Sequence, residues 1–219
     1  MPPYSISVFS PAYNDEGTIA SLVLAALETL EELTDDYRHV RAIHHPQNRG
    51  YGGALQTGFA SASKELIFYT DGDAQYDPRE LKMLYEHFDE QVDFVNGWKL
   101  KRQDPVIRIV LGRLYQYTVK YSFRLKLRDV DCDFRLMRRS IFETVQLEST
   151  SGVICDAGFR RREVPVSHYH RLYGKSQFFN YRRLWWKLVI RREHLRDMRP
   201  PASAQSRTEK HPPRNDPPV

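Results

Sequence analysis

The sequence is poor in cysteine and contains no long apolar run. Its 219 residues include two cysteines, Cys132 and Cys155, without a Cys-x-x-Cys pair or a paired histidine spacing. This scarcity argues against a disulfide framework and against a structural zinc site. No apolar run is long enough to span a bilayer, and the amino terminus lacks the basic segment followed by an apolar one that marks a signal peptide. We therefore expect a protein of a reducing cytoplasm that lies on a membrane surface if it acts at a membrane.

Nucleic-acid-binding signatures are also missing, although the chain is basic. The formal net charge is +5, with lysines and arginines concentrated from Lys99 onward. A charge of this sign suits an anionic partner, which can be nucleic acid, an anionic membrane or a phosphorylated substrate. No helix-turn-helix, RNP or KH motif is present, so a nucleic-acid partner is not expected.

What the sequence does contain is an alternation of short strands and helices. With 41% hydrophobic residues, it can form one well-buried domain. Residues 65–70 are almost continuously apolar, as in a parallel strand covered by helices on both faces. The alternation predicts an α/β fold, a three-layer sandwich around a mostly parallel sheet. Strands are expected at 5–10, 39–44, 65–70, 92–97, 134–137 and 163–166, and helices at 19–33, 50–63, 78–88, 105–127 and 181–194.

The strongest chemical signal follows the apolar stretch 65–70. Asp71 and Asp73 are separated by one glycine, and Gln75 comes two residues later. Open α/β sheets bind ligands at the carboxyl ends of their parallel strands, and carboxylate and amide oxygens suit Mg²⁺ or Mn²⁺ bridged to a diphosphate. An Asp-Gly turn with solvated acids is the alternative interpretation. The buried strand before this turn and the helix that starts at Pro78 favour the metal site.

Two further stretches are weaker signals. Residues 10–16 place polar groups and a helix start at the same end of the sheet, which a capped helix without a ligand would also do. Residues 47–54 contain three glycines that permit close approach of a ligand to the backbone, and Arg49 is suited to meet a phosphate. This second stretch is neither a Walker loop nor a Gly-x-Gly-x-x-Gly motif.

Taken together, these stretches resemble family 2 glycosyltransferases of the GT-A fold, in the dolichyl-phosphate mannosyltransferase and polyprenyl-phosphate glycosyltransferase branch. The resemblance rests on five motifs in the family's order, at residues 11–16, 48–55, 69–78, 129–139 and 163–176. It implies a catalytic domain over residues 1–179. A basic amphipathic helix is expected at 180–198, and a Pro-rich tail at 199–219 is expected to be disordered.

The resemblance also implies roles for individual side chains. It implies a divalent cation, Mg²⁺ or Mn²⁺, held by Asp71, Asp73 and Gln75. It implies a nucleotide-sugar pocket lined by Pro11, Tyr13, Glu16 and Asp71. It implies contacts to the donor or acceptor phosphates from Arg135, Arg138, Arg171, Lys175 and Ser176, for which a solvated basic face is the alternative. If the acceptor is a hydroxyl, the candidate general bases are Asp131 and Asp129.

The sequence departs from the family pattern in three places. Roughly 30 residues, about one strand-helix repeat, are absent after the first helix, where the family has a strand ending in an Asp-Asp-Gly-Ser type motif. If this shortened chain is the real one, the strand around 40–43 is expected directly beside the strand 6–9. A shorter absence lies near 152–159, and Asp133 stands where the family commonly has glycine.

The implied function is metal-dependent, inverting transfer of a hexose from a UDP- or GDP-sugar to a polyprenyl (dolichyl-type) phosphate in the cell envelope. The enzyme would be cytoplasmic and peripheral on the inner face of the membrane, where the tryptophans and basic residues of 181–194 would contact anionic lipid. Packing of that helix on the domain is the alternative. A non-catalytic relative that binds sugar nucleotides or phospholipids is the rival, and the intact Asp71, Asp73 and Gln75 favour the enzyme.

Overall fold

The computed structural model describes residues 4–33, 40–100, 128–129, 132–144 and 159–171, together with 112–114, 116–117 and 120–121. These residues form one β-sheet and the helices that flank it. Five strands form one sheet: β1 (Ile6–Phe9), β2 (Leu66–Thr70), β3 (Phe94–Lys99), β4 (Phe134–Arg138) and β5 (Arg161–Val166). The helices are α1 (Ile19–Leu33), α2 (Gly50–Ser61), the 3-10 turn η1 (Pro78–Glu80), α3 (Leu81–Glu86) and α5 (Ile141–Thr144).

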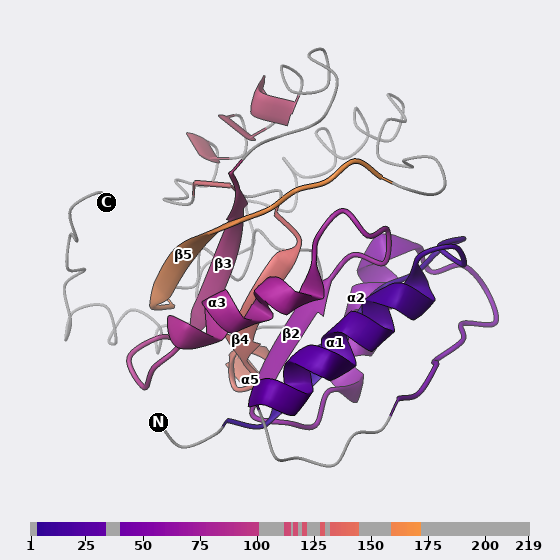
Figure 1. The fold of residues 1–219 in the computed structure, drawn as a ribbon, viewed down its shortest axis with the longest axis horizontal. Coiled ribbons are helices and arrows are strands. Elements are labelled where there is room, and N and C mark those ends of the chain that lie inside the picture. The colour runs from indigo at the N-terminus through magenta and orange to yellow at the C-terminus, as the bar shows by residue number, and fades with distance from the viewer. Residues whose placement is uncertain are drawn as a thin grey trace. The chain divides into compact units, whose positions relative to one another are not determined.

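The sheet is mixed but mostly parallel, as expected. Its strand order is β1-β2-β4-β3-β5, with β1 parallel to β2 and β3 parallel to β5. Figure 1 labels the neighbouring strands β2, β4, β3 and β5. Only β4 runs against its two neighbours, so the other four strands share one direction. The loops after β1, β2, β3 and β5 therefore all leave the sheet at the same edge.

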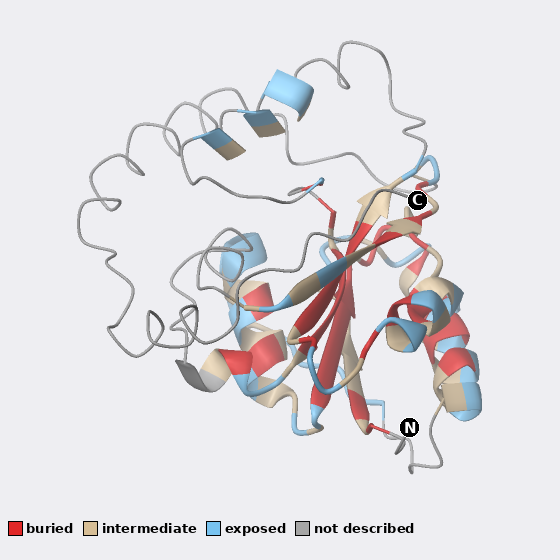
Figure 2. Cartoon of the chain, turned by 90° about the vertical axis from the view of Figure 1, so that its left-hand side faces the viewer, coloured by how far each residue is buried: buried red, intermediate tan, exposed pale blue. Residues whose placement is uncertain are grey.

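Helices cover both faces of the sheet, which gives the three layers predicted from the sequence. On one face Leu66 and Phe68 of β2 pack against α3 and the end of α1. On the other face Ile67 and Tyr69, the alternate residues of the same strand, pack against α2 and α5. All five residues of β2 are buried, and Figure 2 shows the buried strands between helices on either side. The continuous apolar run was therefore a correct sign of a strand covered on both faces.

The prediction of a strand at 39–44 is wrong for residues 40–44, which are the described part of this range. Residues 40–44 form no strand, and the strand that pairs with β1 is β2. Val40 and Ile43, whose alternation suggested a strand, are 63% and 49% exposed, so neither sits on a buried sheet face. Period-2 alternation produces a strand only where a neighbouring strand is available to pair with it. The described residues between α1 and α2, 40–49, form no strand, so this segment does not pair with β1 as the prediction required.

Two of the predicted helices fall largely outside the described residues. Of the helix expected at 105–127, the described residues 112–114, 116–117 and 120–121 are helical. The helix expected at 181–194 and the tail lie outside the described residues. Within the part of the chain that is described, no helix combines the length and apolar character needed to cross a bilayer.

Helix α2 lies so close to β1 that Gly58 cannot carry a side chain without displacing an aromatic ring. A Cβ at Gly58 would be 2.3 Å from two ring carbons of Phe9, and that ring is packed against Phe59 and Tyr69. We predict that Gly58→Ala lowers the free energy of unfolding by about 1–3 kcal/mol, because the ring must move out of its packing. Urea denaturation measures this change. The matched control is Gly52→Ala in the same helix, where a Cβ meets nothing within 4 Å. Gly52→Ala should raise the free energy of unfolding by up to about 1 kcal/mol, because alanine is preferred over glycine inside helices. If Gly58→Ala also raised the free energy of unfolding, the close packing of α2 on β1 would be contradicted.

Candidate functional site

The loops that follow β1 and β2 are in direct contact at the carboxyl edge of the sheet. The Gly72 amide donates to the Pro11 carbonyl (3.3 Å), and the Thr18 hydroxyl donates to the Gly72 carbonyl (2.7 Å). A Cβ at Gly72 would lie 3.1 Å from the Pro11 oxygen, so glycine permits this close approach. The first motif and the acidic motif, separated by more than fifty residues in the sequence, therefore form one surface.

Asp73 is the buried acid of this surface. Its side chain is 5% exposed. One carboxylate oxygen accepts the Gln75 amide (3.1 Å), and the other lies 2.5 Å from Nη2 of Arg171. Between Asp73 and Gln75, Ala74 has a left-handed backbone with φ of 58°, a conformation that is uncommon for non-glycine residues. Burial raises the pKa of the Asp73 carboxyl above its usual value, although the nearby Arg171 guanidinium opposes this shift.

The second carboxylate, Asp71, is bound by a residue of the glycine-rich stretch. The hydroxyl of Tyr51, in the first turn of α2, donates to Asp71 Oδ1 (2.8 Å). The start of α2 is shaped by its first residue, Gly50, which has φ of 71° and donates its amide to Asn48 Oδ1 (2.7 Å). This contact brings a third motif to the same place. Tyr51 is a site residue that the sequence analysis missed, and its position between the motif's glycines was the available signal.

The fifth motif reaches the site through the loop after β5. Gln75 and Tyr169 exchange two hydrogen bonds: the Gln75 side-chain amide donates to the Tyr169 carbonyl (3.1 Å), and the Tyr169 amide donates to the Gln75 carbonyl (2.9 Å). The Ser167 amide donates to Glu80 (2.8 Å). These bonds place Arg171 over Asp73. Lys175 and Ser176, the other predicted phosphate contacts of this motif, lie outside the described residues.

The start of β4 supplies the far wall of the site. The Tyr69 hydroxyl donates to Asp133 Oδ1 (3.3 Å), so the carboxylate that replaces the family's glycine lies on this surface. Arg135 is 2% exposed, donates its Nε to the Cys132 carbonyl (3.0 Å) and lies 6.0 Å from the Tyr69 ring. Arg135 is thus near the site but enclosed by protein, a position from which it supports the wall of the site.

The remaining predicted site residues divide into three groups. Tyr13 and Glu16 are exposed beside the Pro11 turn. Asp129 is buried beside the end of β3. Its backbone carbonyl accepts a hydrogen bond from the Asn96 side-chain amide (3.1 Å), and its Oδ2 lies 3.5 Å from the backbone amide of Lys99. Asp131 lies outside the described residues.

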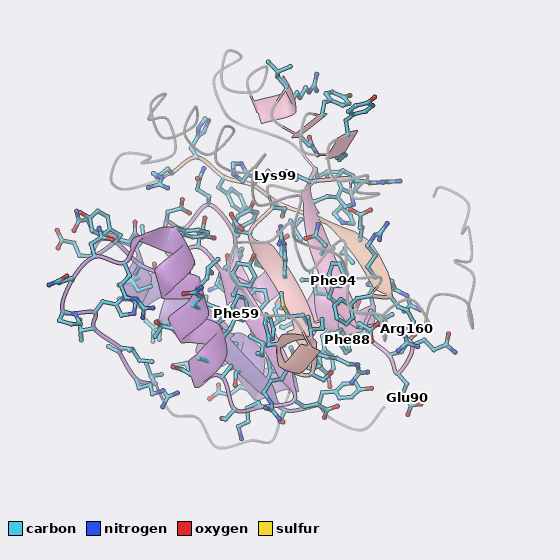
Figure 3. All side chains as sticks on the ribbon, turned by 180° about the vertical axis from the view of Figure 1, so that it is seen from behind. Phe59, Phe88, Glu90, Phe94, Lys99 and Arg160 are labelled. Atoms are coloured by element: carbon cyan, nitrogen blue, oxygen red, sulfur yellow. The ribbon has the colours of Figure 1, made fainter. Side chains whose placement is uncertain are left out.

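The structure does not bring Arg138 to this cluster. It ends β4, and because β4 is antiparallel it pairs with Leu66, at the start of β2 rather than at its carboxyl end. Figure 3 shows the two ends of the sheet: Lys99 marks the carboxyl end of β3, and Arg160 and Glu90 lie toward the other end. The Arg138 amide donates to the Asp93 carbonyl at that second end. Arg138 is therefore not part of the candidate site, contrary to the phosphate contact that the resemblance implied.

The acidic turn suits a cation that is shared with a ligand rather than a closed metal cage. In the described part of the chain, no group of three or more His, Cys, Asp or Glu side chains is placed to hold a metal ion. Asp71 and Asp73 offer carboxylate oxygens on one turn. Mg²⁺ and similar ions are commonly held by one or two carboxylates together with substrate phosphates. The residues therefore fit a divalent cation whose remaining ligands come from a diphosphate and water.

The cysteine beside the site is chemically inert. Cys132 is fully buried, and burial raises the pKa of its thiol to about 12. Because the thiolate is the reactive form, we predict that iodoacetamide at pH 8 leaves Cys132 unmodified in the folded protein and alkylates it readily in urea. Peptide mass spectrometry checks this outcome. Labelling of Cys132 in the folded protein at a rate similar to that in urea would contradict its burial.

Three kinds of similarity accompany this geometry. The sequence profile described as "Glycosyl transferase family 2" matches residues 25–146. The chain is 30% identical over 211 residues to an undecaprenyl-phosphate 4-deoxy-4-formamido-L-arabinose transferase from Pseudomonas aeruginosa, covering 81% of this chain. It is 27% identical over 203 residues to the Aeromonas hydrophila protein of the same name, covering 79% of this chain. The aligned region spans 62% of the length of both relatives.

Solved structures show the same fold. Glucosyl-3-phosphoglycerate synthase from Mycobacterium tuberculosis, in complex with Mn²⁺ and UDP-glucose, superposes with a TM-score of 0.58 at 16% identity, over 85% of this chain and 77% of that one. The same synthase in complex with Mn²⁺, UDP and phosphoglyceric acid gives a TM-score of 0.56 at 16% identity, over 77% of this chain and 72% of that one. These similarities confirm the GT-A fold that was expected from the sequence motifs.

Proposed function

Since this chain belongs to glycosyl transferase family 2, we propose that it transfers a hexose from a UDP- or GDP-sugar to a polyprenyl phosphate, with inversion and with a divalent cation at Asp71 and Asp73. The single observation that carries the proposal is the meeting of three separate segments at the turn that holds these two acids. Those segments contribute Pro11, Tyr51 and Arg171 to the same edge of the sheet. A relative of the same fold that no longer binds a ligand need not keep these contacts.

The donor's diphosphate would lie against the acidic turn. Asp71 and Asp73 would hold Mg²⁺ or Mn²⁺ together with Gln75, and a bound cation would neutralise charge on the departing nucleoside diphosphate. The Tyr51 hydroxyl orients the Asp71 carboxylate. Pro11, Tyr13 and Glu16 would line the nucleotide side. The structures of the mycobacterial synthase with Mn²⁺ and UDP-glucose support this class of ligand for the fold.

The acceptor we propose is a polyprenyl phosphate, in keeping with the names of the bacterial relatives. A phosphate monoester has a second pKa of about 6, so it is largely a dianion at neutral pH and a ready nucleophile. It requires little help from a general base. Asp129 and Asp131 would act as bases only for a hydroxyl acceptor, and the burial of Asp129 gives it a supporting role instead. Arg171, Lys175 and Ser176 would contact the phosphates.

Because this acceptor is a membrane lipid, the protein would work as a peripheral enzyme on the inner face of the membrane, with 181–194 as its lipid contact.

The test uses the full chain with defined donors and a defined acceptor. UDP-glucose and GDP-mannose are titrated by calorimetry with and without Mn²⁺, and transfer of radiolabelled sugar to undecaprenyl phosphate is then followed in detergent. We expect one donor to bind in a Mn²⁺-dependent manner and its sugar to appear in the lipid fraction. Binding without transfer would favour a non-catalytic sugar-nucleotide-binding relative. Absence of both binding and transfer with either donor would overturn the proposal.

A further inference from the structure

Arg171 occupies the carboxylate on which the proposed function places a cation. Its Nη2 lies 2.5 Å from Oδ2 of Asp73, a side chain that is only 5% exposed. The other oxygen of Asp73 accepts the Gln75 amide (3.1 Å). Both carboxylate oxygens are therefore engaged by the protein itself. Each carboxylate oxygen keeps a second lone pair, but a divalent cation at Oδ2 would lie beside the positive Arg171 guanidinium, and the two like charges repel each other. The Gln75 amide carries no charge and belongs to the backbone of the same turn.

The Arg171 side chain is the partner that can leave. Its loop is fastened to the acidic turn by the two bonds between Gln75 and Tyr169, which involve no part of Arg171. Within the described structure, the Nε of Arg171 is buried and has no hydrogen-bond acceptor. The guanidinium thus has an unused buried donor beside its ion pair. Phosphate oxygens satisfy a guanidinium with two parallel hydrogen bonds, which a single carboxylate oxygen does not provide.

We propose that Arg171 and the divalent cation compete for Asp73 in the free chain, and that a nucleoside diphosphate ends the competition by taking the guanidinium. This inference rests on the proposed function, since it concerns the same cation and the same diphosphate. It assigns Arg171 a second role as a positioning residue that couples the two ligands. Cation alone binds weakly, cation with nucleoside diphosphate binds tightly, and by linkage each ligand strengthens the binding of the other to the same degree.

The competition is measured through the cation, independently of sugar transfer. Mn²⁺ is titrated against the full chain by electron paramagnetic resonance, with and without saturating UDP, for wild type, Arg171→Ala and Arg171→Gln. Without UDP, both variants should bind Mn²⁺ about tenfold more tightly than wild type, within the usual range of coupling between two ligands. UDP should strengthen Mn²⁺ binding in all three proteins, because the diphosphate also coordinates the cation. The factor should be about tenfold larger in wild type, where UDP additionally draws the Arg171 guanidinium away from Asp73.

The matched control removes a positive charge elsewhere on the same domain. Arg79→Ala deletes an arginine whose side chain is 60% exposed and which pairs with Glu28 on the surface (3.3 Å). It should leave Mn²⁺ binding as in wild type, because its charge is screened by solvent. Circular dichroism verifies that each variant is folded, and Arg171→Gln keeps a hydrogen-bonding side chain beside Asp73 if the alanine variant unfolds.

The inference is overturned if neither Arg171 variant binds Mn²⁺ more tightly than wild type in the absence of UDP. It is also overturned if UDP still strengthens Mn²⁺ binding in the variants as much as in wild type. These outcomes are separate from failure of the proposed function. If the chain shows the expected coupling between Mn²⁺ and UDP but transfers no sugar, the competition at Asp73 stands and the proposed transferase activity fails.

Discussion

Replacement of Asp73 by alanine is expected to abolish cation-dependent donor binding and to slow sugar transfer by at least about a hundredfold. Loss of one group that stabilises charge at a reacting centre typically costs two to three orders of magnitude in rate. Asp73 is also the more enclosed of the two acids, with both carboxylate oxygens engaged. A cation that loses this ligand keeps one protein carboxylate, Asp71, and the phosphates of the donor. Initial rates with radiolabelled donor, together with calorimetry in the presence of Mn²⁺, measure the effect.

The fold should survive this substitution. β2, which precedes the acidic turn, is buried on both faces and paired to β1 and β4, so the packing of the sheet does not depend on the carboxylate. Asp73→Asn is the isosteric control: it keeps the shape and the hydrogen bond from Gln75 but removes the charge, and it should lose activity to a similar extent. Both variants should still unfold in one cooperative transition, with a lower midpoint because the ion pair with Arg171 is lost. Turnover at the wild-type rate by either variant would remove the basis for the metal-dependent mechanism.

Replacement of Arg138 by alanine should have the opposite profile, with a large loss of stability and no change in donor binding. Its Nε donates to the Val92 carbonyl (3.1 Å) and its Nη2 to the Asp89 carbonyl (2.9 Å), while Nη1 pairs with Glu65 (3.2 Å). The guanidinium also lies 5.0 Å from the centre of the Phe88 ring. Hydrogen bonds from a charged group contribute about 1.5–3 kcal/mol, and the Val92 and Asp89 carbonyls would each lose a part-buried hydrogen bond. We therefore expect the free energy of unfolding to fall by about 2–4 kcal/mol.

Urea denaturation and donor titration on the same samples distinguish the structural role of Arg138 from a phosphate contact. Arg79→Ala serves as the matched arginine variant, because its surface ion pairs are expected to contribute less than about 1 kcal/mol. If Arg138→Ala weakens donor binding tenfold while leaving the urea midpoint unchanged, Arg138 contacts the ligand after all, and its placement at the far end of β4 is wrong.

The contrast between Arg135 and Arg138 shows where reasoning from the sequence reaches its limit. Both arginines belong to one motif and one strand, and both were expected at phosphates. Their separation of three residues puts them on opposite faces of the sheet, because side chains alternate along a strand. The direction of β4 then decides which end of the strand faces the ligand edge, and an antiparallel strand reverses it. Neither the register nor the direction can be read from a single short strand.

The sequence by itself determined the strands and helices that are specified by the spacing of apolar residues over a short stretch of chain. The apolar run of 65–70 predicted a strand covered on both faces, and the 3.6-residue periodicity after Thr18 predicted α1. The placement of Asp71 and Asp73 at the carboxyl end of a parallel strand followed from that order of elements. The same approach failed at 40–43, where an alternating pattern without a neighbouring strand remained exposed.

Only the tertiary structure decided which side chains meet around the two acids. Tyr51 reaches Asp71 across 20 positions of the chain, and Arg171 reaches Asp73 across 98. No periodicity relates residues so far apart, because their contact depends on the order and direction of strands in the sheet. The acidic motif could be recognised from the sequence, but the pairing of Asp73 with Arg171 could not. That pairing arises because the loop after β5 leaves the sheet at the same edge as the loop after β2, and a buried carboxylate gains most from the nearest cation that the fold provides.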